Sequence, residues 1–203
     1  MSAASDTGLV VGLNCALQRR VAFAGKVSLG GVNRALESST GIGGKGQGAW
    51  VATQQLLQRQ GAEASQINTK LVQFYGSGDE GSALVGSLRS FLREVQANDG
   101  DGDGGDVEAL WVQTASKTRI CTTLVSADSG EATEIVEPSG AVLGEEMDSL
   151  MAALQAEKAA AVDGQLPGVL VMGTMPPGCP GDAYGQIVGA VAGPATKVIR
   201  RKW

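Results

Sequence analysis

Histidine is absent from the 203-residue chain, and cysteine occurs only three times, as Cys15, Cys121 and Cys179. Zinc sites in proteins are built mainly from histidine and paired cysteines, so we expect no metal site. An odd number of widely spaced cysteines also argues against a disulfide framework. We therefore expect three buried thiols in a reducing compartment.

Basic residues are also few, because 16 lysines and arginines face 21 aspartates and glutamates, for a net charge of −5. This balance gives no electrostatic reason to bind nucleic acid or an anionic membrane. No apolar run approaches the roughly 20 residues of a membrane span. The N-terminus lacks the basic and apolar regions of a secretion signal. We expect a cytoplasmic protein, with an organelle as the open alternative.

Glycine, in contrast, is abundant at 30 residues, and hydrophobic residues make up 43% of a chain long enough for one buried core. Short apolar runs alternate with amphipathic ones, which predicts an α/β fold with βαβ units on a mostly parallel sheet. We expect strands at 8–14, 69–76, 109–114, 118–128, 132–138, 168–173 and from 196, and helices at 46–60, 81–96, 145–161 and 182–192.

Residues 41–48, GIGGKGQG, carry five glycines and one lysine just before a predicted helix. They do not form a Walker A loop, because Gly46 follows Lys45 where serine or threonine is required, and Ser39 replaces the first glycine. A glycine-rich turn at a helix N-terminus still offers backbone N–H groups and a lysine charge to an anion or a polyhydroxylated ligand. The alternative is a tight turn in which the glycines only permit positive φ.

Two further patterns resemble ligand loops. Gly76, Gly78 and Gly81 form a G-x-G-x-x-G between a strand and a helix, which is typical either of a dinucleotide site or of an ordinary strand-to-helix turn. The run NDGDGDGGD, residues 98–106, imitates a calcium loop. Leu110 stands where that loop needs a bidentate glutamate, so we expect a solvated acidic insertion instead.

Two single residues also lie where ligands bind. Arg119 is charged within an otherwise apolar, β-branched strand, so it points to solvent, pairs with an acid, or faces a site that receives an anion. Thr174, in GTMPPG, follows a buried strand at the sheet end where open α/β folds bind ligands, although a proline-stiffened turn would look the same.

Taken in order, these motifs resemble the PfkB (ribokinase-like) carbohydrate kinases, nearest the branch of 1-phosphofructokinases and tagatose-6-phosphate kinases. The resemblance runs from Leu9 to about Val198, and its most specific parts are the GGKG loop and the later turn, similar to S-G-S-x-P-P-G. The stretches that carry it are GLNCALQ, GGVNRA, GIGGKGQGAWVA, TRICTTLV with GEATEIVEPSG, and VMGTMPPGCPGDAYGQIV.

The resemblance implies a three-layer α/β/α fold with a mostly parallel sheet and a small β lid, to which residues 17–35 contribute. It implies transfer of the ATP γ-phosphoryl group, with Mg²⁺, to a hydroxyl of a sugar or sugar phosphate. It also implies a homodimer formed through the lid.

Site residues are likewise implied by the resemblance. The sugar site would be lined by Asn14, Gly43, Gly44 and Lys45, and Thr174 would stand where the family has a sugar-contacting serine. Arg119 would hold the phosphate of the substrate. Arg34 would contact a phosphate from the other subunit of a dimer. Gln18 stands in place of the family's aspartate, and Gly48 replaces an asparagine. Two sugar-hydroxyl partners are thus altered, which leaves the identity of the sugar open.

The family's N-x-x-E segment, its G-A-G-D motif with the base aspartate, and its nucleotide site have no counterpart in residues 1–203. We therefore expect a partial kinase domain, incomplete at the C-terminus, with no catalytic residue, poor ATP and Mg²⁺ binding and little turnover alone. We also expect an exposed sheet edge near residues 196–199. Two alternatives stay open: a non-catalytic fragment that binds a sugar phosphate or pairs with a complete kinase, and a dinucleotide-binding domain that uses GSGDEG.

Overall fold

The computed structural model describes residues 6–60, 67–96, 108–161, 164 and 166–200. The predicted acidic run 98–106 lies outside these residues. The strands are β1 (Asp6–Asn14), β2 (Ala16–Phe23), β3 (Glu37–Gly43), β4 (Ile67–Ser77), β5 (Trp111–Lys117), β6 (Ile120–Ser126), β7 (Ala132–Val136), β8 (Gly168–Val171) and β9 (Lys197–Arg200). The helices are α1 (Lys45–Gln60), α2 (Asp79–Gln96), α3 (Gly144–Ala160) and α4 (Ala183–Val191).

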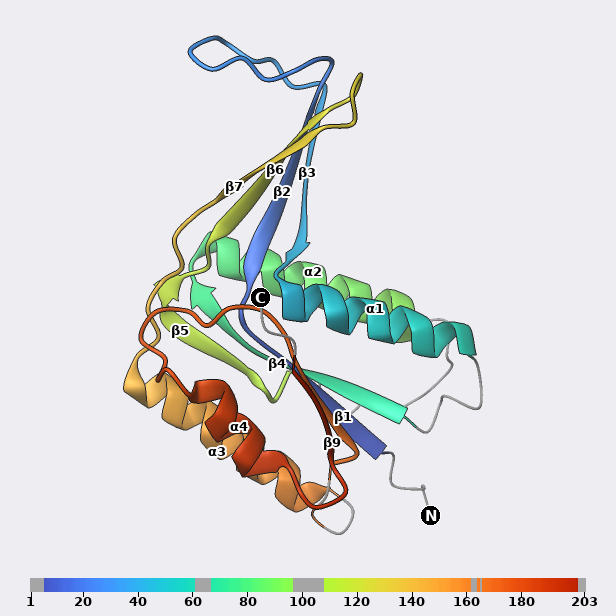
Figure 1. Cartoon of the computed structure of the whole chain (residues 1–203), viewed down its shortest axis with the longest axis vertical. Coiled ribbons are helices and arrows are strands. Elements are labelled where there is room, and N and C mark those ends of the chain that lie inside the picture. Colours follow the sequence, from blue (N-terminus) through green and yellow to red (C-terminus); the bar gives the residue numbers. More distant parts are fainter. Residues whose placement is uncertain (1–5, 61–66, 97–107, 162–163, 165, 201–203) are drawn as a thin grey trace.

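A five-stranded sheet, in the order β5-β4-β1-β8-β9, forms the centre of the protein. Every neighbouring pair in it is parallel, so the predicted parallel α/β architecture is confirmed. Helices α1 and α2 cover one face, and α3 and α4 cover the other (Figure 1). Because both faces are covered, central strand β1 is apolar throughout its middle, with Leu9, Val10 and Val11 all buried.

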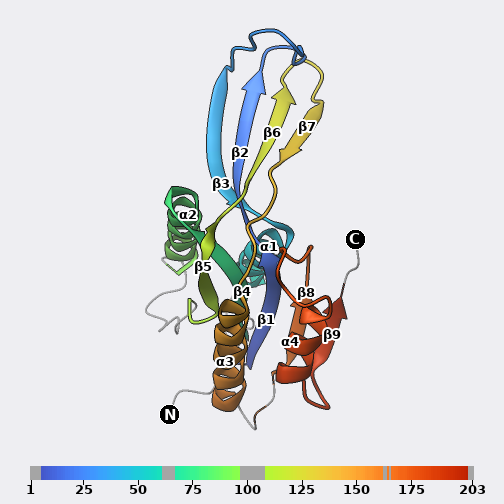
Figure 2. The same ribbon diagram turned by 90° about the vertical axis from the view of Figure 1, so that its left-hand side faces the viewer.

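A second sheet of four strands, in the order β3-β2-β6-β7, stands away from the three layers as a lid (Figure 2). β2 pairs antiparallel with β3, β6 pairs antiparallel with β7, and β2 joins the two hairpins by a parallel pairing with β6. The sequence predicted two strands where β6 and β7 lie, and the resemblance assigned residues 17–35 to the lid. The lid is larger than this segment, because β3, β6 and β7 also build it.

The predicted glycine turn at 41–48 is shorter than expected. Gly41 and Gly43 lie in β3, where they pair with Gln18 and Ala16. A Cβ atom on Gly43 would lie only 2.8 Å from the carbonyl oxygen of Ala16, so glycine is needed for close strand pairing rather than for a turn. Of this run, Gly44 alone has a positive φ, of 102°, and it joins β3 to α1.

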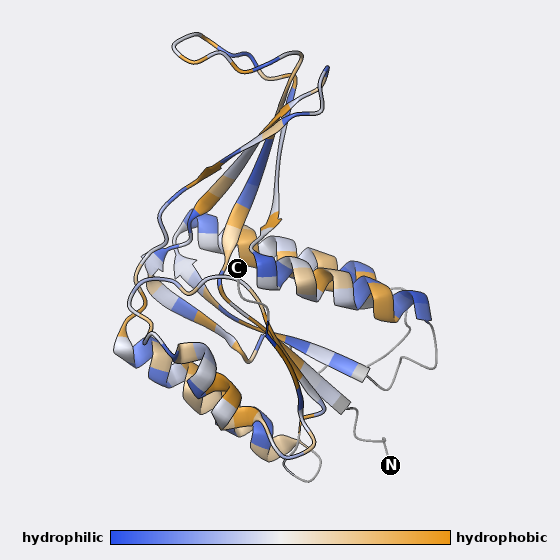
Figure 3. Ribbon diagram, in the orientation of Figure 1, coloured by the Kyte–Doolittle hydropathy of each residue, from blue (hydrophilic) through white to orange (hydrophobic). Residues whose placement is uncertain are grey.

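The core has one cluster on each side of the central sheet. Leu150 and Leu154 of α3 and Ile187 of α4 are fully buried in one cluster. The other forms around Trp50 of α1, whose ring packs edge-on against Phe91 and Trp111. Figure 3 shows apolar stretches along these helices, with polar residues between them.

The three thiols are free, as expected, but they are not equally buried. Cys15 and Cys121 are buried, whereas Cys179 is partly exposed because it lies in the proline-rich turn after β8. Within the described residues, no helix is long and apolar enough to span a membrane, and no three acidic or cysteine side chains gather as metal ligands.

The expected exposed sheet edge is also present. β9 is the last strand on its side of the sheet, all four of its residues are exposed, and Ile199 is 63% exposed.

Candidate functional site

Two strand ends meet at the centre of the sheet. From β1 the chain continues to β4 on one side, and β8 lies on the other side, so the winding direction reverses between β1 and β8. Open α/β sheets bind ligands at such a switch point, beyond the carboxyl ends of the strands. Asn14 ends β1, and Thr174 follows β8 by three residues, so both lie at this point.

Asn14 is the centre of a hydrogen-bonded group at the switch point. Its Nδ2 donates to Oγ1 of Thr174 at 3.1 Å, and its Oδ1 accepts from Oγ of Ser139 at 2.8 Å. The resemblance implied that Asn14 and Thr174, which are 160 positions apart, belong to one site, and the structure brings them together. Ser139 was missed, although it lies in the quoted stretch GEATEIVEPSG after β7.

Lys45 reaches the same region from α1. It is exposed at the first position of the helix, and a Cβ atom on Gly173 would lie 3.6 Å from its own Cβ. Gly173 directly precedes Thr174 and has a φ of 89°. The Gly44–Lys45 turn and the turn after β8 therefore lie side by side.

The buried side-chain amide of Gln47 lies next to Gly44 and holds the start of α1. Gln47 is fully buried, and its Nε2 donates to the carbonyl oxygen of Gly12 at 2.7 Å and to Oε1 of Gln73 at 2.9 Å. These bonds tie the start of α1 to β1 and β4. The α1 N-terminus is therefore held in place by the protein before any ligand binds.

Arg119 lies just before β6 rather than inside a strand. Its Nε donates to the carbonyl oxygen of Cys15, and its Nη2 donates to that of Asn14, both at 3.2 Å. In the described part of the chain no acid forms an ion pair with it. These contacts use two of the five guanidinium N–H groups and place the charge at the end of β1.

A pocket opens beside this group, at the carboxyl ends of β1, β4 and β5. Its charged lining residues are Lys117 and Arg119, and Asn14 and Ser139 also line it. Among the described residues that line it, none is aspartate or glutamate. The lining is therefore suited to an anion. No sequence pattern pointed to Lys117, although it stands two positions before the predicted Arg119.

Gln18 and Arg34 belong to the lid. The Nε2 of Gln18 donates to Oγ1 of Thr123 at 2.8 Å, across the β2–β6 pairing. Arg34 is exposed in the connection between β2 and β3, at the far end of the lid. Neither lines the pocket, so their assignment to a ligand stays a prediction.

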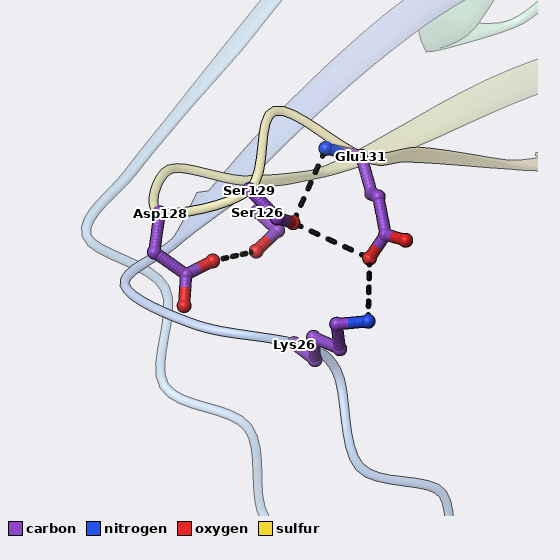
Figure 4. Close-up of polar contacts among 5 residues, drawn as sticks. All are labelled: Lys26, Ser126, Asp128, Ser129 and Glu131. Carbon is purple, nitrogen blue, oxygen red and sulfur yellow. Dashed lines mark hydrogen bonds and ion pairs between the residues drawn. The ribbon is translucent and has the colours of Figure 1, made fainter.

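The far end of the lid is held by polar contacts (Figure 4). Nζ of Lys26, which follows β2, lies 3.0 Å from a carboxylate oxygen of Glu131 in the β6–β7 turn. In the same turn, Ser126 donates to Asp128, and Ser129 donates to Glu131. The Lys26–Glu131 ion pair joins the two hairpins at the end that carries Arg34, and the two serine contacts lie within the β6–β7 hairpin.

The glycine pattern GSGDEG has a structural explanation. A Cβ atom on Gly81 would overlap the carbonyl oxygen of Gly76, and the N–H of Gly76 donates to Oγ1 of Thr118 at 2.7 Å. Gly76 and Gly81 are thus needed for strand-to-helix packing, which is the alternative to a dinucleotide site.

Tyr184 of α4 supports the turn that carries Thr174. Its hydroxyl lies 3.1 Å from the carbonyl oxygen of Thr174 and 3.3 Å from that of Met172. Burial raises the pKa of Tyr184 to about 12, so the hydroxyl remains a donor. Burial likewise raises the pKa of the Cys15 thiol to about 12, which leaves Cys15 protonated and unsuited to act as a nucleophile.

A parallel five-stranded sheet with helices on both faces and a small mixed sheet beside it matches half of the ribokinase-like fold. No protein-family model matches the chain, and no curated protein does. Solved structures do match. The chain superposes on Escherichia coli phosphofructokinase-2 in complex with fructose-6-phosphate with a TM-score of 0.68, at 18% identity, over 98% of this chain and 55% of that one.

Two further structures match in the same way. A candidate 1-phosphofructokinase from Thermotoga maritima gives a TM-score of 0.67 at 19% identity, over 96% of this chain and 53% of that one. A candidate phosphofructokinase from Staphylococcus aureus gives 0.65 at 20% identity, over 96% and 52%. The chain thus shares the fold of these proteins and spans little more than half of their length.

Proposed function

We propose that this chain forms the acceptor-binding portion of an ATP-dependent kinase that phosphorylates a hydroxyl group of a sugar or sugar phosphate. The observation that carries the proposal is the hydrogen-bonded group of Asn14, Thr174 and Ser139 at the switch point, beside a pocket lined by cations. The similarity to a phosphofructokinase-2 crystallised with fructose-6-phosphate supports this class of ligand.

The residues suit the two chemical parts of such a ligand. Amide and hydroxyl groups both donate and accept, so Asn14 and Thr174 can bind sugar hydroxyls. Arg119, oriented by two backbone carbonyl groups, can bind a phosphate through its remaining N–H groups. Lys45 adds a positive charge at the N-terminus of α1, where backbone N–H groups also favour an anion.

Phosphoryl transfer also needs Mg²⁺, ATP and a base near the accepting hydroxyl. A carboxylate is the usual ligand of Mg²⁺ and a common base, and none lines the pocket in the part of the chain that the structure describes. The donor set therefore does not fit Mg²⁺–ATP. We assign acceptor binding to these residues and expect little turnover from the 203-residue chain alone.

Titration calorimetry with fructose 6-phosphate tests the proposal. We expect binding by the folded chain, and roughly tenfold weaker binding by Asn14→Ala and Thr174→Val, since each loses one hydrogen bond to a ligand. Thr133→Val is the matched control, because Thr133 is exposed on β7 of the lid and does not line the pocket. A chain that folds but does not bind the sugar phosphate would refute the proposal.

The lid supports a second part of the proposal, a homodimer. Large apolar side chains are exposed in the connection between β2 and β3 and on β7. Leu29 is 96% exposed, Val32 is 83% exposed, and Ile135 and Val136 are each 53% exposed. Exposed apolar groups of this kind indicate an interface, and one of the matched structures is a tetrameric form of phosphofructokinase-2. We propose a second copy of this chain as the partner.

Sedimentation velocity tests the dimer. The double variant Leu29→Asp and Val32→Asp should be monomeric at concentrations where the unchanged chain is dimeric. Leu56→Asp, which alters an exposed leucine of α1 outside the lid, is the control and should leave the dimer intact. A monomeric unchanged chain at high concentration would exclude the homodimer and leave association with a complete kinase to be measured in a mixture.

A further inference from the structure

A bulge at the end of β5 precedes two cationic residues that line the pocket, the exposed Lys117 and the half-buried Arg119. β5 pairs with β4 in regular register as far as Thr114, opposite Gly76, and the pairing resumes with Lys117 opposite Ser77. Two residues of β5, 115 and 116, therefore have no partner on β4. Such bulges redirect the side chains that follow them, and Lys117 and Arg119 both line the pocket.

Side-chain contacts fix the inserted residues. The N–H of Ala115 donates to Oε1 of Glu146 at 2.6 Å, and the carbonyl oxygen of Ala115 accepts from Oγ of Ser77 at 2.8 Å. Oγ of Ser116 donates to the carbonyl oxygen of Ala141 at 2.6 Å. The bulge is therefore not a loose connection but a held segment.

Two glycines enclose the backbone at Lys117. A Cβ atom on Gly140 would lie 3.1 Å from the carbonyl oxygen of Lys117, and one on Gly76 would overlap its carbonyl carbon. Only glycine leaves room for this path of the chain. Since the backbone is ordered before a ligand arrives, less entropy is lost when the cation binds an anion.

The charges in the pocket are unbalanced. In the part of the chain that the structure describes, Lys117 and Arg119 form no ion pair, and no carboxylate lines the pocket. The attraction of one cation is proportional to the charge of the ligand, so a single cation already favours a doubly charged group to some extent. A second cation adds a further attraction for each ligand charge, so the pair favours a dianion over a monoanion.

We propose that Lys117 is a specificity-determining residue that acts with Arg119 to select the dianionic form of a phosphate on the acceptor. The inference rests on the proposed function, and it narrows the acceptor from a sugar or sugar phosphate to a phosphate monoester. The observation behind it is the bulge that places Lys117 in the pocket beside Arg119.

Calorimetric titration with fructose 6-phosphate and fructose 6-sulfate at pH 8 tests the inference. At this pH the phosphate ester is a dianion, because its second pKa is about 6, whereas the sulfate ester is a monoanion of similar shape. We expect the unchanged chain to prefer the phosphate ester. Lys117→Gln should weaken phosphate binding roughly tenfold and sulfate binding less, so that the preference shrinks.

Two control variants separate charge from folding. Lys117→Arg keeps the charge and should keep the preference. Lys197→Gln removes the same charge at the start of β9, four strands away and at the opposite end of a parallel sheet, and should change neither affinity.

The outcomes separate this inference from the function on which it rests. If Lys117→Gln binds both esters as the unchanged chain does, the role of Lys117 is refuted while the proposed function stands. If the unchanged chain binds neither ester, the proposed function fails, and the role of Lys117 fails with it. A Lys117→Arg variant that loses the preference would also refute a role that depends on charge.

Discussion

The contact between α1 and β1 gives opposite predictions for two glycines of the same helix. Gly46 and Gly12 are buried, and their backbones touch: a Cβ atom on Gly12 would lie 2.5 Å from Cα of Gly46, and one on Gly46 would lie 2.9 Å from the nitrogen of Gly12. Gly48 is exposed two residues further on, and a Cβ atom there would have no neighbour within 4 Å.

The distances set the size of each effect. Carbon atoms pack at about 3.5–4.0 Å, so Gly46→Ala must move the start of α1 away from β1 by roughly 1 Å. Forcing a methyl group into a packed core costs about 1–3 kcal/mol. At exposed Gly48, alanine instead gains about 0.5–1 kcal/mol through helix propensity. We expect the two variants to differ by about 2 kcal/mol or more, with opposite signs relative to the unchanged chain.

Urea unfolding followed by circular dichroism measures this difference, and titration with fructose 6-phosphate adds a functional readout. Gly46→Ala should also weaken binding, because Lys45 moves with the start of α1, whereas Gly48→Ala should leave binding unchanged. If Gly46→Ala is as stable as Gly48→Ala, then α1 does not rest on β1 through this glycine pair and the reasoning is wrong.

Three further predictions concern buried polar groups. Burial raises the pKa of the Cys15 thiol from 9.0 to about 12, so between pH 9 and 10 the thiol ionises only in the unfolded chain. The melting temperature should therefore fall from pH 9 to pH 10, and Cys15→Ala should reduce this fall. Lys70 and Glu157 form an ion pair at 2.7 Å, and both side chains are only 13% exposed. A double-mutant cycle on the free energy of unfolding should give a coupling energy of about 1–2 kcal/mol, and a value near zero would contradict this. Glu146→Gln should destabilise the chain by about 1–3 kcal/mol in urea, because one of two backbone N–H groups loses its acceptor; an unchanged midpoint would contradict this.

Local patterns predicted the secondary structure well where an element buries one continuous apolar face. The expected helix at 46–60 is α1, which begins one residue earlier, and the expected strand at 69–76 lies within β4. β3 was missed, because Glu37–Gly43 contains small and polar residues and is mostly exposed. What makes it a strand is its pairing with β2, and local composition carries no signal of that partner.

The site was predicted where a local pattern or the family resemblance pointed to a residue. Thr174 could be placed at the site because it follows a buried strand, at the sheet edge where ligands bind, and Asn14 could be placed there through the resemblance. Ser139 and Lys117 could not, since one follows the lid and the other follows a bulge. Their positions depend on pairing register and on distant packing contacts, which one sequence does not reveal.

The two central strands of the lid begin next to residues that line the pocket. Asn14 ends β1 and Ala16 begins β2, while Arg119 directly precedes β6, so both central lid strands start at site residues. Arg119 also connects the beginnings of these two strands directly. Its carbonyl oxygen accepts from the N–H of Leu17, and its guanidinium donates to the carbonyl oxygens of Asn14 and Cys15. A substitution where these strands begin would therefore alter the lid and the pocket together. Thr174 and Lys117 lie outside the lid strands, which is why variants at these two positions can test ligand binding separately from the lid.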